Sequence, residues 1–141
     1  MNVELAPQHK VGLTLSHPLL VANGTAELLA LLDRSVIGAV VAPAIGARAR
    51  LPRRVGERPG GLLVEEGRGA FSLSGLRQLL RAAGDLPVLG RVPAADVRGA
   101  VRAAERLASE GVRALELDLL PGDLPLAGEV LEAVREACDL P

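Results

Sequence analysis

Residues 85–120 read DLPVLGRVPAADVRGAVRAAERLASEGVRALELDLL, and this stretch decides the fold. A short apolar run at 87–92 is followed by residues 94–110, where apolar side chains share one face and arginine and glutamate share the other. That spacing predicts an amphipathic helix, and Gly111 is expected to end it. A second apolar run, 112–120, follows at once. A buried strand, a helix and another buried strand in this order predict a parallel sheet with a right-handed crossover.

The same alternation recurs along the chain, so we expect four strand–helix units. The strands are expected at 18–22, 36–42, 87–92 and 112–120, and the helices at 25–32, 76–83, 94–110 and 126–137. Two short apolar segments around Pro7-Gln8-His9-Lys10 predict an antiparallel hairpin before the first unit. The arginine-rich and glycine-rich stretch 46–69 is expected to be irregular, with a short strand at 62–65 and a turn at Gly60-Gly61.

The sequence Asp139-Leu140-Pro141 repeats Asp85-Leu86-Pro87, which leads from a helix into a strand. A fifth strand is therefore expected to begin at Pro141. An eight-unit barrel takes about 250 residues, and four units plus a hairpin fit half of it. The predicted fold class is α/β, with residues 1–141 forming a single domain that is half of a (β/α)8 TIM barrel. Because an open four-stranded sheet leaves two edges uncovered, we expect a homodimer or a complementary half-barrel as partner.

Composition argues against several classes of function. The 141 residues carry a formal net charge of -1 and a single aromatic residue, Phe71, whereas nucleic-acid binding needs a positive surface and stacking rings. No nucleic-acid partner is expected. No run reaches the roughly 20 apolar residues of a membrane helix. The sequence opens without the features of a secretory signal and has one cysteine, so we expect a cytoplasmic protein without internal disulfides. Its two histidines lack metal-ligand spacing, so no metal is expected.

Three polar features admit both functional and structural interpretations. Glu116 and Asp118 alternate with leucines, so both carboxylates are expected on the face opposite the leucines. Either they are acid/base groups with shifted pKa values, or they form an ion pair with an arginine such as Arg91. We favour the ion pair. Thr25 caps a helix or helps to bind an anion, and we favour the cap. Five arginines bind a phosphate or an acidic partner or, as we favour, lie on a solvated loop; they are Arg48, Arg50, Arg53, Arg54 and Arg58.

Six segments match one family in order and spacing along the whole chain: Val3-Glu-Leu-Ala-Pro7, Gly12-Leu13, Pro18-Leu-Leu-Val-Ala-Asn-Gly-Thr25, Gly38-Ala-Val-Val41, Leu115-Glu-Leu117 and Val134-Arg-Glu-Ala-Cys-Asp-Leu-Pro141. Together they resemble the amino-terminal half of class 1 dihydroorotate dehydrogenases. That family folds as a flavin-binding (β/α)8 barrel and oxidises dihydroorotate to orotate through FMN in pyrimidine biosynthesis. The resemblance implies that FMN would lie at the carboxyl ends of the strands and that the ligand is a small molecule.

The resemblance also implies individual site residues. Ala22-Asn23-Gly24-Thr25 is similar to the family's Ala-Ser-Gly-Thr, where the backbone approaches the flavin ring. Arg91 stands where the family has a flavin-contacting Asn, and Asp118 opens the segment that corresponds to Asn-Ile-Ser-Cys-Pro-Asn. The implied FMN-binding residues are Ala22, Asn23, Gly24, Arg91 and Asp118. Residues 72–78 resemble the orotate-binding loop Asn-Ser-x-Gly-Leu-x-Asn, which implies substrate-binding roles for Ser72, Gly75 and Leu76.

Two chemical groups of the family are missing. Ala42-Pro43-Ala44 stands in place of Thr-Lys-Thr, whose lysine contacts flavin and substrate, and residues 118–123 contain no Cys or Ser to act as a base. We therefore predict no catalytic residue, and we expect this chain alone to be a truncated relative of the dehydrogenases that is inactive or weakly active. The alternative is a non-catalytic half-barrel that dimerises, pairs with a complementary half or binds a small ligand.

Overall fold

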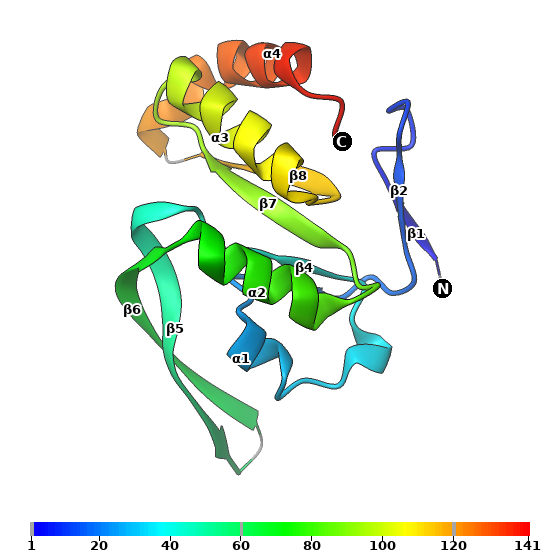
Figure 1. Cartoon of the computed structure of the whole chain (residues 1–141), viewed down its shortest axis with the longest axis vertical. Helices are drawn as coiled ribbons and strands as arrows, with labels where there is room; N and C mark the ends of the chain where they lie inside the picture. Colours follow the sequence, from blue (N-terminus) through cyan, green and yellow to red (C-terminus); the bar gives the residue numbers. More distant parts are fainter. Residues whose placement is uncertain (1, 60, 120) are drawn as a thin grey trace.

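The computed structural model describes residues 2–59, 61–119 and 121–141, and for 46–58, 61–70, 121 and 123 it describes the backbone alone. Figure 1 shows the elements in chain order. They are β1 (Val3–Leu5), β2 (Leu13–Leu15), β3 (Leu20–Val21), α1 (Ala26–Leu29), η1 (Arg34–Val36), β4 (Ala39–Val41), β5 (Gly46–Arg58), β6 (Gly61–Phe71), α2 (Leu73–Ala83), β7 (Val88–Pro93), α3 (Val97–Glu110), β8 (Ala114–Asp118), η2 (Pro121–Leu126) and α4 (Ala127–Ala137).

A four-stranded parallel sheet organises the molecule, with strand order β3-β4-β7-β8. The strands follow one another in space as they do in the sequence. Because parallel connections are right-handed, this order places the crossover helices on one face of the sheet, and Figure 1 shows α2 and α3 together in front of β4 and β7. The predicted α/β class and the parallel sheet are confirmed.

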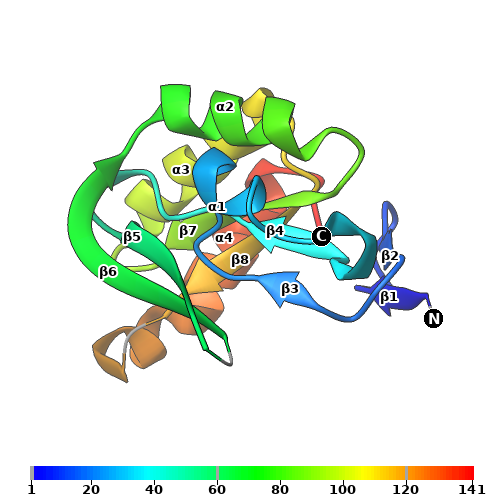
Figure 2. The ribbon, with the colours of Figure 1, turned by 90° about the horizontal axis from the view of Figure 1, so that it is seen from below.

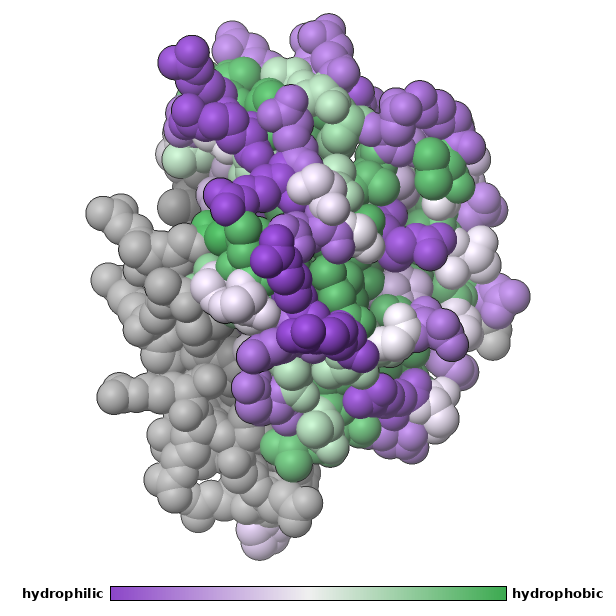
Figure 3. Space-filling model, viewed as in Figure 1, coloured by the Kyte–Doolittle hydropathy of each residue, from purple (hydrophilic) through white to green (hydrophobic). Residues whose placement is uncertain are grey.

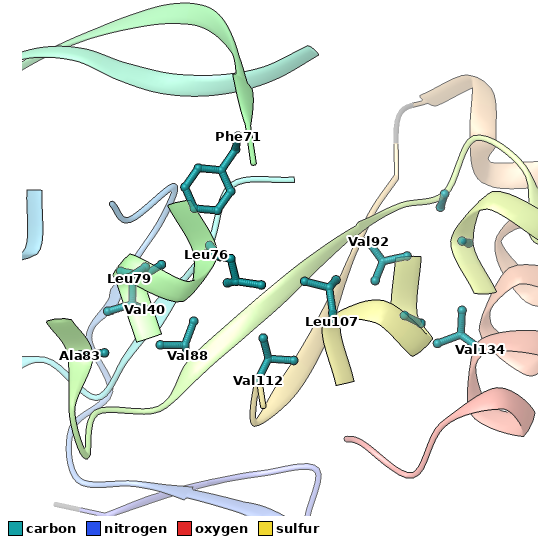
Figure 4. Close-up of a cluster of buried hydrophobic side chains, with 14 of the residues drawn as sticks. Val40, Phe71, Leu76, Leu79, Ala83, Val88, Val92, Leu107, Val112 and Val134 are labelled. Carbon is teal, nitrogen blue, oxygen red and sulfur yellow. The ribbon is translucent and has the colours of Figure 1, made fainter. Parts of the chain in front are cut away.

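The main hydrophobic core lies between the sheet and these helices (Figure 4). Val40, Val88 and Val92 of the sheet face Leu76 of α2 and Leu107 of α3, and each of these five side chains is at most 2% exposed. A residue that size, fully buried, contributes about 1.5–3 kcal/mol relative to leaving it exposed. The apolar spacing predicted for α3 is therefore what fixes the helix against β7.

The opposite face of the sheet is covered near the strand starts by β1 and β2, which pair antiparallel with Val3 opposite Leu15. Leu13 and Leu15 pack in a second buried cluster with sheet residues Ala39, Val41, Leu89 and Ala114. The alternation of a strand explains both cores, because successive side chains point to opposite faces. Only the carboxyl-terminal part of this second face is left for polar residues.

The stretch predicted to be irregular forms a ribbon instead. β5 and β6 pair antiparallel from Gly46 opposite Phe71 to Arg58 opposite Gly61, and the ribbon stands apart from the parallel sheet (Figure 2). The strand predicted at 62–65 lies within the longer β6, whereas the prediction that the rest of residues 46–69 is irregular was wrong. Residues 47–51 alternate small or apolar with charged residues, which is a strand period. Their charge is also typical of a solvated loop, and this favoured the irregular prediction. A register shift at Pro52/Arg54 accommodates a proline that the regular ladder would exclude.

Side-chain caps set the helix boundaries. The Thr25 hydroxyl accepts a hydrogen bond from Leu28 N at 3.3 Å, so its predicted capping role is confirmed. Asp96 caps α3 by accepting from Gly99 N at 2.6 Å, and α3 therefore begins at Val97 rather than at 94. Gly111 ends that helix with φ +93°, a left-handed conformation that favours glycine.

The two Asp-Leu-Pro sequences make the same backbone contact. Val40 N on β4 donates to Pro87 O at 2.9 Å, and Leu115 N on β8 donates to Pro141 O at 2.8 Å. Pro87 leads directly into β7, which pairs with β4. Pro141 therefore lies beside β8 in the place that Pro87 takes beside β4.

Candidate functional site

Polar residues gather where the parallel strands end. Arg91 of β7 lies opposite Glu116 of β8, and Pro93 lies opposite Asp118. Because side chains alternate along a strand, these four residues share the sheet face that Leu89 and Ala114 occupy nearer the strand starts. This face is thus apolar under β2 and polar at the carboxyl ends. In parallel α/β sheets, ligands bind at those ends.

Arg91 connects three of the strand ends. Its Nε donates to Glu116 Oε1 at 2.8 Å, its Nη2 lies 2.7 Å from the same oxygen, and its Nη1 donates to Asn23 Oδ1 at 2.6 Å. The Arg91 side chain is 16% exposed and that of Glu116 is 40% exposed. The predicted pairing of Glu116 with an arginine such as Arg91 is confirmed. We call Asn23, Arg91 and Glu116 the Arg91 network.

A backbone hydrogen bond and close packing against β4 fix the turn that carries Asn23. Asn23 has φ +51°, a left-handed conformation that Asn tolerates. The Gly24 N–H donates to Val41 O at 2.9 Å, and a Cβ at Gly24 would lie 2.1 Å from Val40 Cγ1. Gly24 is therefore required for close packing of this turn on β4, and its N–H is already bonded. Ala22 is exposed beside it.

The residues expected to hold substrate form the start of α2. The Ser72 hydroxyl caps the helix by accepting from Gly75 N at 3.1 Å. A Cβ at Gly75 would lie 3.0 Å from the Phe71 ring, and the Leu76 side chain is fully buried in the main core. Among the described residues, no hydrogen bond joins this group to the Arg91 network. Capping and packing account for the Gly-Leu pair.

Residues 42 and 43 at the end of β4 offer neither a cation nor a free backbone donor. Pro43 is fully buried and has no backbone N–H, and the N–H of Ala42 before it donates to Leu89 O at 2.9 Å. Asp118, at the end of β8, is exposed, and its backbone carbonyl accepts from Ala94 N at 3.2 Å.

These contacts test whether the site fits FMN. A flavin ring is held by protein donors at its polar edge and tuned by charge near N1 and N5. Here Gly24 N–H is already bonded, Pro43 has no N–H, and the charge of Arg91 is neutralised by Glu116. The described residues at the strand ends therefore fit a flavin ring poorly, because the Gly24 N–H and the Arg91 guanidinium are already bonded and Pro43 has no N–H.

The sequence predicts that Asn23 and Arg91 lie at the same edge of the sheet, but it does not predict the hydrogen bond between them. They are 68 positions apart, and neither residue type signals its partner. Several other expectations lie outside the described residues: the side chains of the five arginines at 48–58, those of Pro121 and Asp123, and half of the turn at Gly60-Gly61.

The described residues contain neither a metal-binding cluster nor a membrane-spanning helix. No cluster of three or more His, Cys, Asp or Glu is arranged to hold a metal ion. Among the described helices, none combines the length and apolar character that crossing a bilayer requires.

No protein-family model matches the chain, and no curated protein sequence matches it.

Proposed function

We propose that this chain is the amino-terminal half of a (β/α)8 barrel related to the dihydroorotate dehydrogenases, and that this half does not oxidise dihydroorotate by itself. The observation that carries the proposal is the repeated hydrogen bond of the Asp-Leu-Pro sequences. Pro141 stands beside β8 as Pro87 stands beside β4, so the next residue in the repeat would start a strand along the free edge of β8.

The sheet order supports the barrel half. Strands of a (β/α)8 barrel follow one another in chain order with their helices outside, and β3-β4-β7-β8 with α2 and α3 on one face has this arrangement. The second face, with β2 at the strand starts and the Arg91 network at the strand ends, would then line the barrel interior. Closure would require four further units, because about eight strands are needed for a packed barrel.

The residue types at the strand ends support the proposal that this chain alone does not oxidise dihydroorotate. Lys10 is the only lysine in the sequence. It lies between β1 and β2 and pairs with Asp139 at 2.5 Å, with both side chains largely exposed. The chain therefore has no second lysine for the end of β4, where the resemblance would place one. General acid–base catalysis alone is worth about 100- to 10,000-fold in rate, so losing the base together with the lysine removes most of the activity.

An assay with dye reduction tests this proposal. Purified chain, dihydroorotate, FMN and a redox dye are mixed, and an intact dihydroorotate dehydrogenase serves as the positive control. We expect dye reduction no faster than with free FMN, and no quenching of FMN fluorescence by the chain. Turnover that rises in proportion to the chain concentration, and persists after repurification, would overturn the non-catalytic assignment.

Self-pairing is a second candidate function, favoured by exposed leucines at both ends of the strand order. Leu19 and Leu31, before and after the first unit, are 55% and 60% exposed, and Leu124 and Leu131, which follow β8, are 63% and 41% exposed. Exposed apolar groups of this kind mark interaction surfaces when they cluster. Leu19 precedes β3, and Leu124 and Leu131 follow β8; β3 and β8 are the two outer strands of the parallel sheet.

Sedimentation equilibrium distinguishes a paired half-barrel from an isolated one. We expect a dimer at micromolar concentration that dissociates in Leu19→Glu and Leu124→Glu. Gln78→Glu, on the exposed face of α2, is the matched control and should stay dimeric. A monomer at 100 times the assay concentration would refute self-pairing. The barrel-half proposal would then require a complementary half-barrel as partner.

A further inference from the structure

A cavity of about 260 Å³ lies between α3 and the carboxyl end of the sheet. Its walls come from α3, from β7 and from the residue just before β5. The lining residues are Ile45, Arg91, Pro93, Arg102, Ala103, Arg106 and Leu107. No acidic residue is among them.

The cavity has an apolar floor. Leu107 is 1% exposed and belongs to the main core, and Ala103 and Ile45 are half-buried beside it. Small-molecule sites typically combine such apolar walls with a few convergent polar groups. This floor would accommodate a small hydrocarbon or ring.

Two arginines on α3 supply the charge of the rim. Arg102 and Arg106 are one helical turn apart, so their side chains are neighbours, and like charges at this spacing repel. Both are exposed. Among the described residues the ion pairs use Lys10, Arg77 and Arg91, and neither Arg102 nor Arg106 forms one.

Glu110 and Glu116 are each already paired with another arginine. Glu110, one turn after Arg106, accepts two hydrogen bonds from Arg77 at 2.6 Å each. Glu116 is bonded to Arg91, whose own charge is thereby neutralised. Arg102 and Arg106 therefore place two guanidinium groups in the lining of an apolar cavity. The pKa of Glu110 is lowered by its hydrogen bonds from Arg77 and, to a smaller extent, by the charge of Arg106. Figure 3 shows hydrophilic and apolar residues interspersed on the face of the molecule that it views.

We propose that this cavity binds a small organic phosphate monoester, with the phosphate between Arg102 and Arg106 and the organic part on Leu107 and Ala103. A phosphate monoester carries about two negative charges near pH 7, which matches the two guanidinium groups. The planar guanidinium pairs with phosphate oxygens through two parallel hydrogen bonds. The site is formed by α3, β7 and Ile45, and it does not depend on the proposed relationship to the dehydrogenases.

Calorimetric titration with phenyl phosphate tests the site on the full chain. We expect saturable binding with a stoichiometry of one, weakened about tenfold or more in R102Q/R106Q, because two charge-assisted contacts are lost. Arg98→Gln is the matched control: it removes the same charge one turn earlier on α3, outside the cavity, and should bind like the wild type. Ala103→Leu keeps both arginines but fills the floor, and should also weaken binding.

Other outcomes would overturn the proposal. They are no heat of binding with the wild-type chain, equal weakening in Arg98→Gln and R102Q/R106Q, or unchanged affinity in Ala103→Leu. Binding of inorganic phosphate as tight as that of phenyl phosphate would also overturn it, because the apolar floor would then contribute nothing. Circular dichroism of each variant confirms that α3 is intact, since all three arginines are exposed positions on the helix.

Discussion

Removing the charge of Glu116 from the Arg91 network should destabilise the fold, because among the described residues the largely buried guanidinium would then have only neutral side-chain partners, namely Asn23 and the amide at position 116. Arg91 is 16% exposed, whereas Glu116 is 40% exposed. Exposed ion pairs contribute about 0–1 kcal/mol, and losing one partner of a fully buried pair costs about 3–5 kcal/mol. This pair lies between these limits, and the exposure of Glu116 places it nearer the lower one. We expect Glu116→Gln to lower the free energy of unfolding by about 1–2 kcal/mol.

A double-mutant cycle isolates the interaction. Arg91→Met, Glu116→Gln and the double variant are unfolded in urea, and stabilities are compared at equal ionic strength. We expect the double variant to be more stable than the sum of the single effects predicts, by about 1 kcal/mol, because neither charge is then left unpaired. The coupling should persist in 1 M salt, since a partly buried pair is weakly screened.

The exposed pair Lys10–Asp139 is the internal control for this cycle. Its side chains are 65% and 75% exposed, so its coupling should be no more than about 0.5 kcal/mol and should fall in salt. If the Arg91–Glu116 coupling were as small as that of Lys10–Asp139, the conclusion that the network holds the strand ends together would be wrong.

Three further perturbations test other parts of the fold. Gly38→Ala should lower stability by about 1–3 kcal/mol or prevent folding, because the added Cβ would lie 1.8 Å from the backbone oxygen of His17; thermal unfolding measures this. Asp96→Ala should cost about 1 kcal/mol in urea unfolding, through the lost cap of α3. Hydrogen bonds from Arg77 hold the pKa of Glu110 below its usual 4.5, so this pair stabilises the fold above pH 4.5 and the contribution is lost as pH falls through the lowered value. Unfolding curves across that range should show that Arg77→Gln loses less stability on acidification than the wild type, and equal losses would contradict the assignment.

The elements that could be predicted are those whose periodicity is set by burial. The alternation around β7, α3 and β8 was readable because one face of each element is in the core. Helix starts were less readable, because Ser72 and Asp96 decide them through single hydrogen bonds. The β5–β6 ribbon is not readable in this way, because the two strands pair with each other rather than with the parallel sheet and their period of two carries charge instead of hydrophobicity.

The candidate site, like the fold, could be predicted only in part. The shared face of Glu116 and Asp118 follows from strand alternation, and the pairing with Arg91 follows from charge. The cavity beside α3 could not be predicted, because Arg102 and Arg106 belong to a helix face that is polar in any amphipathic helix. What makes them a site is the gap between α3 and β7, which only the packing reveals.

The two polar regions of this chain differ in what a ligand must displace. At the strand ends, a ligand that uses Arg91 or Asn23 must break hydrogen bonds of 2.6–2.8 Å that the protein already makes, so the gain from each new contact is offset by the loss of an existing one. At the α3 cavity, an anion meets two arginines that repel each other, and binding relieves that repulsion. The buried Pro43 at the end of β4 and the hydrogen bonds of the Arg91 network therefore act in the same direction. They make the strand ends a structural element, whereas at the proposed site between α3 and β7 a charged ligand would gain free energy by relieving the repulsion between Arg102 and Arg106.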